Sequence, residues 1–254
     1  MIDSHCHLDF PCFDADRQQI LANCQAKSIH TILIPGTQAS AWDRQISLCK
    51  DKPQLAYALG LHPYFLAHYQ AEHIGQLADL LLVNKNQVLA VGEIGLDFAI
   101  GVDKGLQQEV FERQLCLAET HKLPVILHHR HSHNQIIRTL KRLPVSRKGV
   151  VHAFSGSLYE AQTYIELGFK LGIGGTITYP RAKKTREVVG QVPLSCLLLE
   201  TDAPDMPPIG TQGQRNTPEN LGLILDVLQE LREEPLELIN QTCEQNFYDL
   251  FGGL

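Results

Sequence analysis

The sequence lacks an excess of positive charge. Its 254 residues carry 22 lysines and arginines against 28 aspartates and glutamates, which gives a formal net charge of −6. This balance excludes a protein that coats nucleic acid through a broad basic surface. A nucleic-acid substrate would need a local positive patch or bound cations.

Cysteine motifs and long apolar segments are also missing. The seven cysteines are scattered and no C-x-x-C occurs, which disfavours a disulfide framework or a zinc knuckle and favours a reducing compartment. The opening MIDSHCHLDF has no basic segment followed by an apolar core, so we expect no signal peptide. The longest apolar runs, such as LADLLLV, are too short to span a membrane. We therefore expect a cytoplasmic protein that does not associate with membranes.

No linker, low-complexity tract or charge block divides the chain, so we expect one domain over residues 1–254. Eight short apolar runs alternate with amphipathic stretches, beginning at Met1, Thr31, Ala56, Val88, Pro124, Gly149, Lys170 and Leu197. This alternation is typical of βα units and predicts a (β/α)8 TIM barrel. A doubly wound open sheet is the alternative, but no G-x-G-x-x-G follows the first run. Helices are expected over residues 14–28, 107–121, 158–168, 218–230 and 236–250.

Imidazoles and carboxylates gather where the expected strands end, which is where barrels of this kind place their active sites. These residues are His5, His7, His62, Glu93, Asp97, His128, Arg130, His152, Glu200 and Asp202. Residues two apart on a strand point to the same side, so His5 and His7 can share a metal while Cys6 packs outward. We interpret Asp97 as a loop cap, and the histidines outside the strand ends, together with His129, as ordinary structural residues.

Burying so many ionisable groups at one rim would cost several kcal/mol each without a partner. A divalent metal centre supplies that partner, and the expected ligands are His5, His7, Glu93, His128, His152 and Asp202. Six ligands are too many for one tetrahedral site, so we expect two cations that share Glu93. His5, His7 and Asp202 complete one site, and His128 and His152 complete the other. Such a pair suits attack by an activated water on a phosphodiester or a carbonyl, with Asp202 or Glu200 as the base.

Several motifs in a fixed order resemble the TatD family of metal-dependent deoxyribonucleases, which are amidohydrolase-like barrels. These motifs are DSHCHLDF, GLHP, VGEIGLDF, LPVILHHR, VHAFSGS, LLLETDAP and QRNTPENL. The resemblance implies hydrolysis of DNA with Mg²⁺, Mn²⁺ or Zn²⁺, and it implies the same six metal ligands. It also implies that His62 and Arg130 lie near the substrate phosphates, and that Arg215 and Asn216, in a loop beside the last strand, bind substrate. The family often has GLHPH where this chain reads GLHPY, with Tyr64 at the last position. The segment GIGGTITYPRAKKTR is similar to a subgroup of uncharacterised TatD-like hydrolases.

Two enzymatic functions are consistent with these residues. The first is a nuclease or phosphodiesterase acting on DNA or a small phosphodiester. The second is an amidohydrolase acting on a small amide, lactone or phosphate ester, and the fold cannot decide between them. A phosphate-containing substrate is favoured by the positively charged side chains near the expected mouth of the barrel, which are Arg130, Arg181, Lys183, Lys184, Arg186 and Arg215. The cluster RAKKTR fits a solvated helix face equally well. A complete ligand set disfavours a non-catalytic binding protein, and nothing in the sequence indicates an obligate protein partner.

Overall fold

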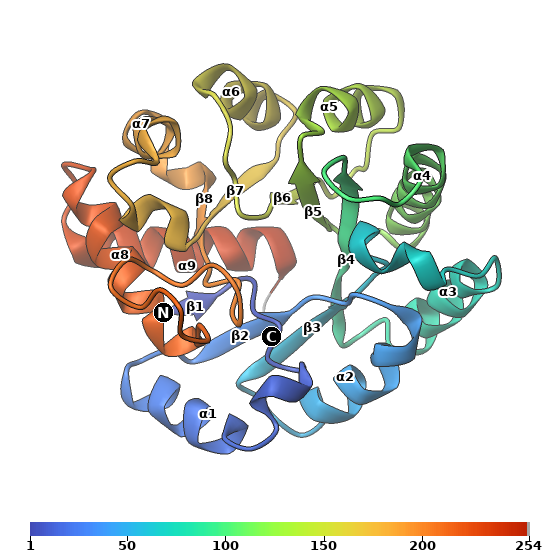
Figure 1. Cartoon of the computed structure of the whole chain (residues 1–254), viewed down its shortest axis with the longest axis horizontal. Helices are drawn as coiled ribbons and strands as arrows, with labels where there is room; N and C mark the ends of the chain where they lie inside the picture. Colours follow the sequence, from blue (N-terminus) through green and yellow to red (C-terminus); the bar gives the residue numbers. More distant parts are fainter. Residues whose placement is uncertain (253–254) are drawn as a thin grey trace.

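The computed structural model describes residues 1–252, and it contains one eight-stranded sheet in which every neighbouring pair is parallel (Figure 1). The strands follow chain order: β1 Ile2–Asp3, β2 Thr31–Ile34, β3 Leu55–Leu59, β4 Val88–Asp97, β5 Val125–Arg130, β6 Gly149–Val151, β7 Lys170–Ile173 and β8 Leu197–Leu199. The backbone N–H of Ser4 donates to the carbonyl of Leu199 at 2.9 Å, which brings the last strand back to the first. The predicted (β/α)8 barrel is therefore confirmed.

The helices form a ring around the strands (Figure 1). They are α1 Arg17–Ala26, α2 Trp42–Cys49, α3 His73–Val83, α4 Lys104–His121, α5 His133–Arg142, α6 Leu158–Glu166, α7 Lys183–Gln191, α8 Leu221–Glu230 and α9 Leu236–Phe251. Short 3-10 turns lie at 11–13, 39–41, 63–68, 175–178, 194–196 and 218–220. No helix of the described residues could cross a membrane.

Local sequence signals explain the helix boundaries. Ser157 and Glu160 form a reciprocal capping box at the start of α6, and Gly168 adopts a φ of +87° just beyond its end. Two expected helices begin later than predicted. A 3-10 turn at 11–13 delays α1 to Arg17, and a 3-10 turn at 218–220 precedes α8.

The interior of the barrel is closed at the amino-terminal ends of the strands. Inward-facing residues such as Ile2, Leu33 and Val150 pack against Phe247 and Phe251 of α9. A larger apolar layer lies between the strands and the outer helices. Because apolar side chains fill one end of the barrel, polar side chains from the strands collect at the opposite, carboxyl end.

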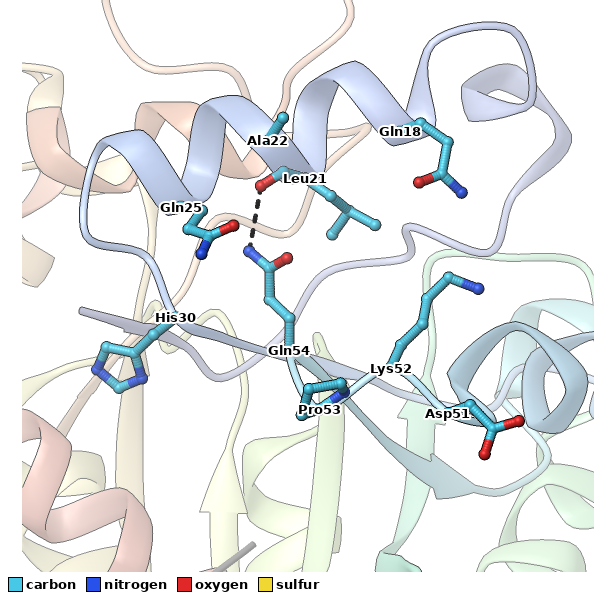
Figure 2. A pocket seen from close by; sticks show the side chains of 9 residues that line it. All are labelled: Gln18, Leu21, Ala22, Gln25, His30, Asp51, Lys52, Pro53 and Gln54. Atoms are coloured by element: carbon cyan, nitrogen blue, oxygen red, sulfur yellow. Dashed lines mark hydrogen bonds between the residues drawn. The ribbon is translucent and has the colours of Figure 1, made fainter.

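A cavity of about 530 Å³ opens near the amino-terminal ends of β2 and β3, beside α1 (Figure 2). The Gln54 amide crosses it and donates to the carbonyls of Leu21 at 3.3 Å and Ile29 at 3.1 Å. None of the predicted site residues lines it. This end of a TIM barrel serves stability rather than catalysis.

Candidate metal centre

The predicted ligands come together at the carboxyl end of the barrel. Glu93 lies within β4 and is 1% exposed, and His128 lies within β5. His152 follows β6 directly, and Asp202 lies three residues beyond β8. Residues at the ends of three other strands therefore surround the buried carboxylate of β4.

The first strand is shorter than the sequence predicts. It ends at Asp3, so the expectation that His5 and His7 lie on the strand is wrong. Beyond Asp3 the regular β1–β2 pairing ends, although the N–H of Cys6 still donates to the carbonyl of Leu33 in β2 at 3.1 Å. The N–H of His7 then donates to the carbonyl of Ala203, in the segment that follows β8. Both imidazoles nevertheless face the site, while Cys6 is buried in the outer apolar layer as predicted.

One oxygen of Glu93 faces the first pair of imidazoles. Its Oε2 lies 3.1 Å from Nε2 of His5 and 3.6 Å from Nε2 of His7. Oδ1 of Asp202 lies 3.7 Å from each of the same two nitrogens. The ligand atoms of His5, His7 and Glu93 lie within 4.8 Å of one another, and Asp202 is near both imidazoles of this group.

The other oxygen of Glu93 faces a second group of imidazoles. Its Oε1 lies 2.9 Å from Nδ1 of His128, 3.2 Å from Nε2 of His62 and 3.9 Å from Nε2 of His152. The His152 ring also stacks on His5, with the ring centroids 3.4 Å apart. His152 therefore lies between the two groups rather than wholly in the second.

His62 is near enough to Glu93 to be a ligand, but its hydrogen bonding suggests another role. Its Nδ1 accepts a hydrogen bond of 3.0 Å from the backbone N–H of Tyr64. A neutral ring that accepts at Nδ1 carries its proton on Nε2, where it donates to an oxygen and cannot bind a cation. This geometry agrees with the predicted position of His62 beside a substrate phosphate.

The donor set fits divalent cations. Both ring nitrogens of His5 and Nδ1 of His7 are buried without a hydrogen-bond partner among residues 1–252. Unpaired buried nitrogens are costly, and cation binding would satisfy the Nε2 atoms. Ligand atoms 3.1–3.7 Å apart match the spacing around a cation that is held at about 2.0–2.2 Å by nitrogen and carboxylate oxygen.

The charges of the site are out of balance without cations. Burial, together with the nearby carboxylates Glu93 and Glu200, raises the pKa of Asp202 to about 8. Burial lowers the pKa of His152, but Glu200, Asp202 and Glu93 outweigh it and raise this pKa to about 10. The cluster therefore takes up protons at neutral pH, and bound cations would replace them.

Glu200 contacts His152 at Nδ1, the ring nitrogen that does not face Glu93. Its carboxylate is fully buried, and Oε1 lies 2.9 Å from Nδ1 of His152 while accepting a 2.6 Å hydrogen bond from the N–H of Ala153. A Cβ atom on Gly172 would overlap Oε2 of Glu200, so this glycine makes room for the carboxylate. A carboxylate on the far nitrogen of a ligand histidine fixes the orientation of the ring.

Asp97 is more than the predicted loop cap. Its Oδ1 does accept a 2.9 Å hydrogen bond from the N–H of Ala99. Its Oδ2, however, lies 3.3 Å from Nε2 of His128 and 4.0 Å from Nη1 of Arg130. His128 is thus held between Glu93 and Asp97. His129 faces away from the site, as predicted, and packs near His133 and Phe154.

A cavity of about 350 Å³ opens above the cluster, and its walls include Arg130, His62 and Asp202. Sequence reasoning missed four further wall residues, which are Phe10, Thr37, Phe65 and Asp205. Thr37 follows β2, where no titratable residue drew attention, and its buried hydroxyl has no hydrogen-bond partner in residues 1–252. Tyr64, at the position where the resemblance departs from the common motif, is 61% exposed on the wall.

Arg215 and Asn216 lie outside this cavity wall. Arg215 pairs with Asp16 and covers the ring of Phe13. The amide of Asn216 is buried and donates to the carbonyls of Thr201 and Asp205. Both side chains hold the loop after β8, and their predicted contact with substrate stays a prediction.

We predict that acid removes both cations. Although burial opposes it, Asp97 and Glu93 raise the pKa of His128, a ligand of one cation. Burial raises the pKa of Asp202, a ligand of the other cation, to about 8. Protons compete with a cation at the ligands that they occupy. As the pH falls from about 8 to about 5, metal analysis after dialysis should therefore show the loss of both cations.

The His128→Asn and His7→Asn variants show which of the two sites each cation occupies. Each variant should lose the cation of its own site at a higher pH than the unsubstituted protein does. Full retention of both cations at pH 5 in the unsubstituted protein would contradict the prediction.

Comparisons with known proteins identify the family. The model of the TatD related DNase family matches residues 2–252. The chain is 46% identical to the uncharacterized metal-dependent hydrolase YjjV of Escherichia coli, over 99% of this chain and 97% of that protein. It is 33% identical to the 3'-5' ssDNA/RNA exonuclease TatD of Erwinia billingiae, over 99% and 98% of the two chains. The crystal structure of E. coli YjjV superposes with a TM-score of 0.97, covering 100% of this chain and 98% of that one. The chain therefore belongs to the TatD family of metal-dependent hydrolases.

Proposed function

We propose that this protein hydrolyses phosphodiester bonds of DNA with two divalent cations that share Glu93. The observation that carries this proposal is the orientation of the Glu93 carboxylate. Its Oε2 faces His5 and His7, and its Oε1 faces His128 at 2.9 Å and His152 at 3.9 Å. One buried carboxylate between two groups of imidazoles is the arrangement that a bridging ligand needs.

The protein residues have separate tasks in this proposal. Bound cations would supply Lewis-acid activation of a water and would neutralise phosphate charge. Asp202 reaches the cavity wall, so its carboxylate is well placed to take the proton of the attacking water. Glu200, with no place on that wall, holds the His152 ring. His62 and Arg130 would donate to the phosphate oxygens.

Two further observations support this reading. Two relatives in the comparisons are named as 3'-5' ssDNA/RNA exonucleases, which favours a nucleic-acid substrate for this chain. All seven cysteines are free, which supports the cytoplasmic location expected from their scattered positions.

Side-by-side assays test the proposal. Purified protein, reconstituted with Mg²⁺, Mn²⁺ or Zn²⁺, is offered single-stranded DNA, RNA, bis(p-nitrophenyl) phosphate, a small amide and a lactone. We expect hydrolysis of DNA and of the small phosphodiester, its loss with a chelator and its return with added metal. Turnover of the amide or lactone with no phosphodiester cleavage would support the amidohydrolase alternative instead.

Arg130→Ala should weaken phosphodiester turnover without changing metal content. The side chain is 62% exposed, and its one ion-pair partner, Asp97, is as far as 4.0 Å away. Its removal should therefore leave the fold intact. Loss of one charge-assisted hydrogen bond, worth about 1.5–3 kcal/mol, should lower kcat/KM about 10- to 150-fold. Steady-state kinetics and metal analysis check this, with the exposed Lys85→Ala as the control. Unchanged kinetics would remove Arg130 from the site.

A further inference from the structure

A second cavity lies on the same face of the barrel as the metal centre, between the starts of α6 and α7. It measures about 550 Å³, and Ser155, Arg181, Lys183 and Lys184 are among its lining residues. The two helices are neighbours in the outer ring (Figure 1). Ser155 is three residues after His152, so this cavity begins within about 11 Å of the metal centre, measured along the chain.

Among the described residues, the cations of this cavity have no acidic or hydrogen-bonding partner, although Arg181 lies over the ring of Tyr179, 5.1 Å from its centroid. Arg181, Lys183 and Lys184 are exposed, and none makes an ion pair or side-chain hydrogen bond within residues 1–252. Arg186 of the same segment differs, because its guanidinium donates to the carbonyl of Ile177 at 2.6 Å. Three unpaired positive charges in one concave surface of a protein with net charge −6 create a local positive potential.

The acidic side chain in the cavity wall does not neutralise these charges fully. Oε2 of Glu160 accepts 2.7 Å hydrogen bonds from the backbone N–H and the hydroxyl of Ser157. That carboxylate therefore serves the capping box of α6. The starts of α6 and α7 also point their positive dipole ends toward the cavity. An anion placed there would meet three cations, two helix ends and one carboxylate that is already hydrogen-bonded.

We propose that this cavity binds a phosphate group of a single-stranded nucleic acid, at a distance from the bond cleaved at the metal centre. The inference rests on the proposed function, because it extends the path of the same substrate. An exposed aromatic residue occurs in the same helix turn, because Tyr159 lies two residues after Ser157 of the cavity wall and is 77% exposed. Cations that contact the backbone and aromatic rings that stack on bases are the two components of single-strand binding.

The structure thus favours phosphate binding over a solvated helix face as the interpretation of RAKKTR. Lys183 and Lys184 start α7 but line a cavity with Arg181, instead of spreading along a convex helix face. The cavity in Figure 2 offers no such cluster, because its Lys52 donates to the carbonyl of Leu48 and lies beside Asp51.

Binding of a short fluorescein-labelled single-stranded oligodeoxynucleotide tests the inference. Fluorescence anisotropy compares the unsubstituted protein with the Lys183→Ala/Lys184→Ala variant across a range of salt concentrations. The control is Lys50→Ala/Lys85→Ala, which removes two exposed charges beyond the ends of α2 and α3, at the opposite end of the barrel. We expect Kd to rise about tenfold, and the slope of log K against log salt to shrink by about 1.4, only in the first variant.

Hydrolysis of bis(p-nitrophenyl) phosphate separates this inference from the proposed function. That substrate is too small to reach both cavities, so the Lys183→Ala/Lys184→Ala variant should hydrolyse it normally. Equal Kd values for the unsubstituted protein and this variant, or equal losses in the two double variants, would overturn the inference. So would selective binding of an acidic peptide in place of the oligonucleotide. Failure of the unsubstituted protein to hydrolyse either phosphodiester would instead refute the proposed function, whatever the Kd values.

Discussion

Glu93→Gln is expected to deplete both cations and to lower phosphodiester hydrolysis by at least about a thousandfold, because cation binding supplies several kcal/mol of charge stabilisation. Glutamine keeps the size of the side chain but removes the negative charge that two dications share. It also replaces one ligand oxygen by an NH₂ group, which donates and does not ligate. Metal analysis and kinetics measure the result, and circular dichroism should show an intact barrel.

His128→Asn is the matched variant for this test. Of the two Glu93 oxygens, His128 contacts only Oε1, at 2.9 Å, whereas His5 and His7 face Oε2. Its substitution should therefore remove mainly the second cation and leave the first in place. Two ions per chain and near-normal activity in Glu93→Gln would show that the carboxylate is not shared.

Glu200→Gln is expected to lower activity about 10- to 100-fold at limiting metal, with recovery when metal is saturating. Glu200 contacts His152 and the Ala153 backbone rather than the cavity, so its loss should loosen a ligand and weaken metal affinity. If Glu200 were instead the base that takes the water's proton, kcat would fall and added metal would not restore it. A metal titration of kcat distinguishes these outcomes.

Gly172→Ala provides an independent check of the same role. The new methyl group would overlap Oε2 of Glu200 and displace the carboxylate without changing its chemistry. Gly174→Ala is the control, because a Cβ there lies 3.5 Å from the nearest atom, which is ordinary contact. We expect the metal requirement to rise in the first variant and to stay unchanged in the second.

The fold could be predicted because its signals are local and repeated. Each strand reads as a short apolar run and each helix carries its own periodicity, as in α6 with its Ser157 cap and Gly168 beyond its end. The convergence of His5, Glu93 and Asp202 could be predicted from their places at the ends of the expected strands, because parallel strands bring their carboxyl ends together.

The remaining features depend on contacts between distant segments. The segment after β1 is bonded to two different parts of the chain, Cys6 to Leu33 and His7 to Ala203, and no pattern near residue 7 reveals these contacts. The Glu200 carboxylate fits only because Gly172, on another strand, has no side chain. Thr37 carries no charge and stands in no motif, so only the cavity geometry identifies it. Arg215 was placed by resemblance, whereas its ion pair with Asp16 depends on how the loop after β8 packs.

A metal titration that follows occupancy and hydrolysis together tests the shared-carboxylate centre most directly. Metal-free protein receives increasing Mn²⁺ or Zn²⁺ while calorimetry counts bound ions and bis(p-nitrophenyl) phosphate reports activity. We predict two equivalents per chain, with hydrolysis appearing as the second is bound. Full activity at one equivalent, or activity without bound metal, would contradict a centre in which Glu93 bridges two cations.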